Sequence, residues 1–279
     1  MTGPLVTTAW LAQHLAEPDL MVLDATYYLP HEGRDAAAEF RAAHIPGARL
    51  FDIDAIADDA TDLPHMVPSP GRFARLVGAL GIGNDRMLVF YDQRGVFSAP
   101  RGWWLMGLFG HDRAAVLDGG LPRWRAEQRS LAAGAPPPPV PAAFRPDFRA
   151  ARLRGIGDML ANVASGAELV LDARGAARFR AEAPELRPGL RPGHIPGAAS
   201  LPYTELLAAD GTMLDPPALR TRLAAAGADG TRPVVTSCGS GVSAAIITLA
   251  LAQAGLPIGA LYDGSWAEWG GRSDTPVAT

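Results

Sequence analysis

The chain has 279 residues, and a hydrophobic content of 48% with a charged content of 19% is typical of a soluble globular protein with one large or two ordinary domains. Its net charge of −4 argues against a nucleic-acid-binding surface, and no apolar run reaches the length of a membrane span. The single cysteine cannot form an internal disulfide and no secretory signal is visible, so we expect a reducing compartment, the cytoplasm.

The first half of the chain alternates short apolar runs with helical patterns. Buried strands are predicted at residues 21–23, 88–91 and 115–117, and helices at residues 73–80 and 100–109. Strands that alternate with helices predict a parallel sheet covered on both faces. Ligands of such sheets bind beyond the carboxyl ends of the strands, so the loops that follow the strands are the places to look for chemistry.

A proline-rich run at residues 134–141 follows the first half. Such a run is extended and cannot enter the interior of a sheet, which favours a linker over a surface loop inside one domain. With residues 131–150 as the linker, the first domain covers residues 1–130 and the second covers residues 151–279.

The second half repeats the alternation. Strands are predicted at residues 169–171, 234–236 and 260–262, and helices at residues 219–226 and 243–254. The expected fold class is therefore α/β, with two tandem domains that each contain a parallel sheet flanked by helices.

The two halves share sequence markers in the same order, which indicates an internal repeat. The matched pairs are His44–Ala48 with His194–Ala198, Leu23–Ala25 with Leu171–Ala173, Asp118-Gly119-Gly120 with Asp263-Gly264-Ser265, and Trp124 with Trp269. Features present in both halves are expected to be structural, so His44 and His194 are interpreted as turn-fixing residues. Features present in only one half are the candidates for chemistry.

Cys238 lies in the loop Cys238–Ser243, between a predicted strand and a predicted helix. The glycines of this loop allow backbone N–H groups to point inward, and the following helix begins with its positive end toward the same place. Both effects favour the thiolate, the nucleophilic form of cysteine. The alternative is an inert buried thiol that packs as a small hydrophobic side chain.

Asp92 occupies the position of Cys238 in the first half, where the loop reads Asp92-Gln93-Arg94-Gly95-Val96. A carboxylate cannot act as a sulfur nucleophile. We therefore expect the first domain to be catalytically inactive and the second to hold the site.

Four further residues have no counterpart in the other half. Asp54 and His65 lie in a polar stretch of the first half, for which a solvated acidic loop with an incidental histidine is the alternative. Arg178 and Arg187 lie in the second half beside Glu182 and Glu185, and spacing alone favours local ion pairs for them.

These features resemble the two-domain rhodanese-like sulfurtransferases over nearly the whole chain: the doubled His-Ile-Pro-Gly-Ala motif, the proline-rich linker, the inactive first repeat and the Cys238 loop. Thiosulfate-using members typically carry basic residues directly after the cysteine, whereas mercaptopyruvate-using members carry Cys-Gly-Ser-Gly or Cys-Gly-Thr-Gly. Cys238–Gly241 has the second pattern, so the resemblance is closest to the 3-mercaptopyruvate sulfurtransferases. Ser243 departs from the family's usual threonine but keeps a hydroxyl.

The resemblance implies that Cys238 accepts sulfur from 3-mercaptopyruvate as a persulfide, releases pyruvate, and passes the sulfur to cyanide or to a thiol such as thioredoxin. It implies that Arg178 and Arg187 bind the substrate carboxylate and carbonyl, and that Ser240 manages a proton with His65 and Asp54. The other loop residues implied in substrate binding are Gly239, Gly241, Val242 and Ser243.

Three other functions are alternatives for a chain with these features. A cysteine phosphatase needs an arginine six positions after the cysteine, and that position is Ala244. A thiosulfate:cyanide sulfurtransferase and a non-catalytic sulfur-carrier or binding module remain the alternatives. The dispersed histidines and the lone cysteine offer no metal-ligand cluster, so neither a metal nor another cofactor is expected.

Overall fold

The computed structural model describes residues 3–279, which form two compact units. Unit 1 contains the residues up to Asp58 with Pro68–Phe148 and Ala209–Met213, and unit 2 contains Asp59–Val67, Arg149–Ala208 and Leu214–Thr279. Each unit thus includes one short segment from the other half of the sequence. No helix within residues 3–279 combines the length and the apolar character needed to cross a membrane.

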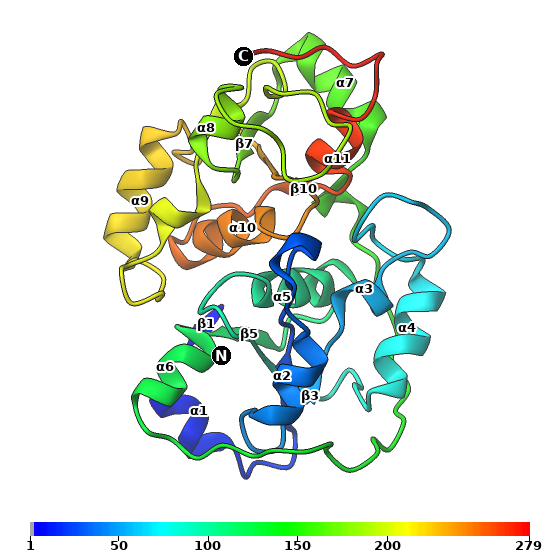
Figure 1. Ribbon diagram of the computed structural model, residues 1–279, viewed down its shortest axis with the longest axis vertical. Helices are drawn as coiled ribbons and strands as arrows, with labels where there is room; N and C mark the ends of the chain where they lie inside the picture. Colours follow the sequence, from blue (N-terminus) through cyan, green and yellow to red (C-terminus); the bar gives the residue numbers. More distant parts are fainter. Residues whose placement is uncertain (1–2) are drawn as a thin grey trace. The chain divides into compact units, whose positions relative to one another are not determined.

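Unit 1 is built on a five-stranded parallel sheet with the order β1-β5-β4-β2-β3. Figure 1 labels β1, β3 and β5 of this sheet. Its strands are β1 (Leu5–Val6), β2 (Leu20–Asp24), β3 (Arg49–Leu50), β4 (Met87–Tyr91) and β5 (Ala114–Leu117). The central strands consist mostly of buried apolar residues, because helices cover both faces of a parallel sheet.

The helices of unit 1 are α1 (Thr8–His14), α2 (Ala36–Ala42), α3 (Ile53–Ile56), α4 (Pro70–Ala79), α5 (Ala99–Leu108) and α6 (Gly120–Ala126), with a 3₁₀ turn η1 at Pro30–Glu32. Helix α4 begins where the Ser69 side chain accepts a hydrogen bond from the Arg72 N–H and Pro70 occupies the first turn. Leu11 and Trp124 pack with Val89 and Leu117 of the sheet in one apolar core.

Unit 2 repeats this plan with the parallel order β6-β10-β9-β7-β8. Its strands are β6 (Leu153–Arg154), β7 (Leu169–Asp172), β8 (Ala199–Ser200), β9 (Val234–Ser237) and β10 (Ala260–Tyr262). Its helices are α7 (Ile156–Ser165), α8 (Ala176–Phe179), α9 (Pro216–Ala225), α10 (Ala244–Gln253) and α11 (Ser265–Trp269), with 3₁₀ turns η2 (Ala150–Arg152) and η3 (Tyr203–Leu206).

The predicted α/β class with two parallel sheets is confirmed. Every strand and helix predicted from the apolar runs is present, within three residues at either end. The proline-rich run has neither helix nor strand and lies along unit 1, where Arg49 Nη1 donates to the Pro137 carbonyl at 2.9 Å and the Ala142 N–H donates to the Gly78 carbonyl at 2.9 Å.

The paired histidines have equivalent surroundings in the two units. The His44 ring stacks on Phe40 and its Nδ1 donates to the Phe40 carbonyl at 2.8 Å. The His194 ring stacks on Phe179 and its Nδ1 donates to the Phe179 carbonyl at 2.9 Å. The same local contact in both units supports a structural role for both rings.

Candidate functional site

Three neighbouring strands of unit 2 end beside one another, and the loops that follow them carry most of the predicted site. Strand β9 lies between β10 and β7, and Cys238 follows β9 directly. On one side, the Ala173 N–H donates to the Ser237 carbonyl at 2.8 Å, which joins the start of the β7 loop to the end of β9. On the other side, Asp263 begins the β10 loop.

The sulfur of Cys238 is buried in its own loop. The residue is 1% exposed, and its Sγ accepts a hydrogen bond from the Gly241 N–H at 3.1 Å. Gly241 has a φ of 80°, a left-handed conformation that glycine adopts at low cost and that turns its N–H toward the sulfur. The loop therefore directs one backbone donor at the sulfur.

Helix α11 binds the outer side of the same loop. The Trp266 N–H donates to the Cys238 carbonyl at 2.9 Å, and the Ala267 N–H donates to the Gly239 carbonyl at 2.8 Å. Ser265 adds a side-chain link, since its Oγ accepts from the Cys238 N–H at 3.2 Å and donates to the Tyr262 carbonyl at 2.9 Å. With its carbonyls held by α11, the loop can present its N–H groups toward the sulfur.

In unit 1 the equivalent loop binds the carboxylate of its own Asp92. Its carboxylate is fully buried and accepts four backbone hydrogen bonds of 2.8–2.9 Å, which come from Arg94, Phe97, Ser98 and Ala99. The loop is therefore an anion-binding cradle that is occupied by its own side chain. This finding is consistent with the predicted silence of the first domain.

The matching amides of unit 2 belong to Ser240, Ser243, Ala244 and Ala245. The Ala245 N–H donates to the Val242 carbonyl at 3.2 Å. Within the described part of the chain, the other three donate to no backbone or side-chain acceptor. In unit 1 the equivalent N–H groups bind the Asp92 carboxylate, so these amides are the unit 2 counterparts of an anion-binding set.

Gly239 and Val242 of this loop differ in how closely other atoms surround them. A Cβ atom at Gly239 would meet nothing within 4 Å, whereas Val242 is 4% exposed and packs into the unit. The loop therefore has room for a Cβ directly after the cysteine.

His65 lies with Cys238 in unit 2, because the segment Asp59–Val67 packs there. Its ring is 4% exposed, and Nδ1 lies 3.2 Å from the Ser240 carbonyl oxygen. A carbonyl oxygen only accepts, so Nδ1 carries the hydrogen, and Nε2 is the acceptor nitrogen when the ring is neutral. The structure thus brings His65 to Ser240 through the backbone carbonyl of that residue.

Arg178 and Arg187 both lie in the connection between β7 and β8, and β7 pairs with β9, the strand that Cys238 follows. The Arg178 side chain is 21% exposed and its Nη1 lies 3.5 Å from Glu185 Oε2, so part of the local ion pairing considered above is present. This contact uses one of the five N–H donors of the guanidinium. Arg187 is half-buried in the same connection.

The buried side chain of Arg174 stabilises this connection. It is fully buried, pairs with Asp172 at 2.7 Å and with Glu185 at 2.6 Å, and lies over the Trp266 ring. Burial raises the pKa of the Glu185 carboxyl, and the cations of Arg174 and Arg178 oppose that rise. Glu185 therefore links a buried arginine to the partly exposed Arg178 and fixes the direction of the Arg178 side chain.

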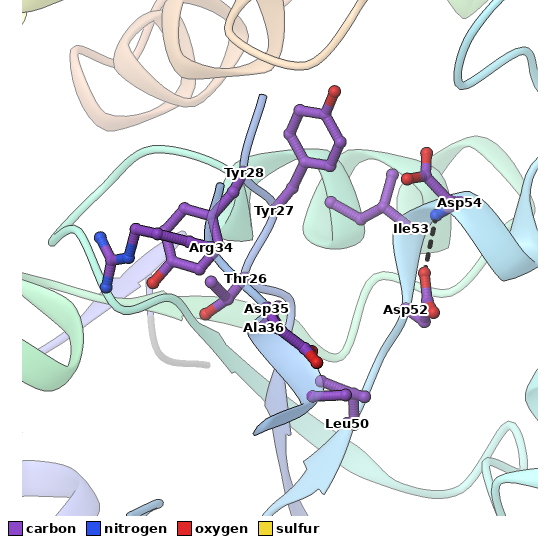
Figure 2. A pocket seen from close by; sticks show the side chains of 11 residues that line it. Thr26, Tyr27, Tyr28, Arg34, Asp35, Ala36, Leu50, Asp52, Ile53 and Asp54 are labelled. Carbon is purple, nitrogen blue, oxygen red and sulfur yellow. Dashed lines mark hydrogen bonds between the residues drawn. The ribbon is translucent and has the colours of Figure 1, made fainter. Parts of the chain in front are cut away.

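Asp54 lies in unit 1, in the first turn of α3. Its N–H donates to Asp52 Oδ1 at 3.0 Å, and both residues line a pocket of about 280 Å³ (Figure 2). Arg34, stacked over the Tyr28 ring at 3.9 Å, lies on another side of this pocket. The participation of Asp54 in one site with Cys238 stays a prediction.

Ser265 and Asp263 are repeat markers in the sequence, but their contacts in the structure, like those of Arg174, are not predicted from it. The repeat contains a signal for Ser265 and Arg174, because Ser265 corresponds to Gly120 and Arg174 to Thr26. Asp263 is shared with Asp118 and so carries no such signal. Within residues 3–279 no group of three or more histidine, cysteine, aspartate or glutamate residues is arranged to hold a metal ion.

Known proteins share this sequence and fold. The Rhodanese-like domain profile matches residues 7–127 and 156–272. The 3-mercaptopyruvate sulfurtransferase of Escherichia coli K12 is 43% identical over 96% of this chain and 95% of that protein, and the thiosulfate sulfurtransferase of Bos taurus is 39% identical over 95% of this chain and 91% of that protein.

The crystal structure of SseA from Escherichia coli, described as a 3-mercaptopyruvate sulfotransferase, superimposes with a TM-score of 0.86 at 39% identity and covers 95% of this chain and 99% of that one. The profile matches both halves of the chain, and the fold agrees over nearly its whole length. The chain therefore belongs to the rhodanese-like family and contains two copies of its domain.

Proposed function

We propose that this protein is a sulfurtransferase that moves sulfur from 3-mercaptopyruvate, through a persulfide on Cys238, to a thiol or cyanide. The observation that carries the proposal is the Cys238 loop, in which the buried sulfur accepts a hydrogen bond from the Gly241 N–H and is followed by the uncharged residues Gly239, Ser240 and Gly241. The relation to the Escherichia coli enzyme over nearly the full length of both chains supports the same activity.

The uncharged loop suits the proposed substrate better than it suits thiosulfate. Thiosulfate is a dianion and is favoured by cations next to the sulfur. Mercaptopyruvate is a monoanion with a planar carboxylate and a neighbouring ketone, and these groups suit the guanidinium forks of Arg178 and Arg187 outside the loop.

In the first stage the Cys238 thiolate attacks the substrate sulfur. The new S–S bond forms as the C–S bond breaks, and the bonding electron pair leaves with pyruvate as its enolate. Arg178 and Arg187 stabilise the negative charge on the carboxylate and on the developing enolate oxygen. A proton must then reach the enolate carbon, and Ser240 with His65 and Asp54 is assigned to this transfer.

In the second stage an acceptor attacks the outer sulfur of the persulfide. The S–S bond breaks, the transferred sulfur leaves with the acceptor, and Cys238 returns as the thiolate. The loop N–H groups stabilise the charge on sulfur in both stages. A dithiol protein such as thioredoxin in the cytoplasm is the acceptor class that this chemistry fits.

The function is tested by initial rates of sulfur transfer with one acceptor and two donors. We expect a higher specificity constant for 3-mercaptopyruvate than for thiosulfate, with one pyruvate released for each sulfur transferred. A preference for thiosulfate would favour the second candidate, the activity named in the Bos taurus relative. A sulfur carrier without catalysis would take up sulfur once and show no turnover.

The loop sequence gives a prediction about donor preference. Gly239→Arg combined with Ser240→Lys places two cations beside the sulfur and removes the Ser240 hydroxyl, so the ratio of specificity constants should shift toward thiosulfate. A Cβ atom at Gly239 meets no atom within 4 Å, so the substitution starts without a clash at that carbon. An unchanged ratio would show that this loop does not set donor preference.

The occupied cradle of unit 1 gives a second prediction. We expect the double variant Asp92→Cys, Cys238→Ser to show no turnover of 3-mercaptopyruvate. Arg94 and Phe97 stand where the active loop has Ser240 and Ser243, and the backbone of Gly211 packs directly on Gly95 of the silent loop. Efficient turnover by this variant, measured as pyruvate release, would contradict the assigned asymmetry.

A further inference from the structure

Two aspartates at equivalent places in the repeat each anchor a segment that comes from the other half of the sequence. In unit 2, Asp263 Oδ2 accepts a hydrogen bond from the Val67 N–H at 2.5 Å. In unit 1, Asp118 Oδ1 accepts from the Met213 N–H at 2.8 Å. Each aspartate directly follows the strand that neighbours the strand of the Cys238 or Asp92 loop.

The two anchored segments differ in what they carry. The segment Asp59–Val67 carries His65, two residues before the anchored amide, and its imidazole contacts the Ser240 carbonyl. The segment Ala209–Met213 places Gly211 against Gly95 and contains no histidine, cysteine or arginine. The same anchoring device is therefore present at an active loop and at a silent one.

His65 needs such an anchor because its backbone is strained. Its φ is 62°, in the left-handed region that a residue with a Cβ rarely adopts. Such a conformation persists only where surrounding contacts enforce it. Asp263 is 4% exposed, so its hydrogen bond to Val67 is shielded from competition by water.

We propose that Asp263 is a positioning residue for sulfur transfer, which holds the segment Asp59–Val67 so that the His65 imidazole stays at the Ser240 carbonyl. The inference rests on the proposed function, in which His65 takes part in moving a proton to the leaving enolate. Asp118 performs the same anchoring in unit 1, where no sulfur is transferred.

The kinetic test compares Asp263→Ala with Asp118→Ala, a matched pair that removes the same kind of bond. We expect Asp263→Ala to lower kcat for pyruvate release about ten- to a hundredfold, because a hydrogen bond to a charged group is lost. Asp118→Ala should keep the wild-type kcat. In a His65→Ala background Asp263→Ala should add little further loss, because the two residues act through one another.

Asp263→Asn is the conservative control. Its amide oxygen still accepts from Val67, but a neutral acceptor is weaker than a carboxylate, so we expect a smaller fall in kcat. This variant keeps the volume of the buried side chain and carries the test if Asp263→Ala does not fold.

Amide hydrogen exchange tests the anchor without relying on activity. Asp263→Ala should speed exchange at Val67 by roughly tenfold or more and leave Met213 unchanged, and Asp118→Ala should give the reverse pattern. If the wild type releases no pyruvate from mercaptopyruvate, the proposed function fails. The hydrogen-exchange measurement still tests the anchoring by Asp263 independently. Equal loss of kcat in the two alanine variants, or full additivity with His65→Ala, would overturn the positioning role.

Discussion

We expect Cys238→Ser to abolish sulfur transfer from 3-mercaptopyruvate and to leave the protein folded. Serine is nearly isosteric with cysteine, and its Oγ can accept the hydrogen bond that the Gly241 N–H donates to the sulfur. A hydroxyl is far less acidic than a thiol and cannot carry a stable persulfide. Pyruvate release should therefore fall to the uncatalysed level, while the melting temperature stays close to that of the wild type.

Mass spectrometry provides the positive counterpart of this loss. Wild-type protein incubated with mercaptopyruvate and no acceptor should gain the mass of one sulfur atom. Because Cys238 is the only cysteine of the chain, the added sulfur should be found on the peptide that contains it. Sustained turnover in Cys238→Ser, or added sulfur without Cys238, would contradict a persulfide at this residue.

The central strands and long helices could be predicted from the sequence because burial leaves a continuous apolar run. Strands β4 and β9 consist almost entirely of buried residues, and α10 is apolar on all sides since it packs inside unit 2. The edge strands β1, β3, β6 and β8 were not predicted. Each is two residues long, too short for any period to appear in the sequence.

What could be predicted of the site comes from comparing equivalent positions in the two halves of the repeat. A difference between equivalent positions predicts Cys238 as the reactive residue against Asp92, and in the structure the Asp92 carboxylate accepts backbone hydrogen bonds from its own loop. Contacts that depend on tertiary packing gave no such signal. The link from Ser265 Oγ to the Cys238 N–H joins residues 27 positions apart, and the link from Asp263 to Val67 joins residues 196 positions apart.

The placement of His65 also depended on tertiary structure. In the sequence it belongs to a polar stretch of the first half, whereas in the structure its segment packs in unit 2. Nothing in the local sequence of that stretch predicts that it packs in unit 2, because the hydrogen bond that stabilises it there comes from Asp263 in the other half of the chain.

Arg178→Lys and Arg187→Lys should each slow the loading of Cys238 far more than the release of its sulfur. Lysine keeps the positive charge but loses the planar two-point fork that matches a carboxylate and a neighbouring ketone. Loss of one charge-assisted contact of this kind costs roughly 1.5–3 kcal/mol, or about ten- to a hundredfold in specificity constant for mercaptopyruvate. Release to a thiol takes place after pyruvate has left, so the substrate clamp no longer contributes.

The experiment loads each variant fully with mercaptopyruvate, removes the donor, and times sulfur transfer to a thiol acceptor. Arg180→Lys is a matched control, because Arg180 is exposed and pairs with Glu182 at 2.8 Å in the same connection. We expect this control to load and release sulfur at wild-type rates. If Arg178→Lys and Arg187→Lys slow release as much as loading, the two arginines support the loop or the fold. For Arg178, such a supporting role would be explained by its ion pair with Glu185, because Glu185 also pairs with the buried Arg174.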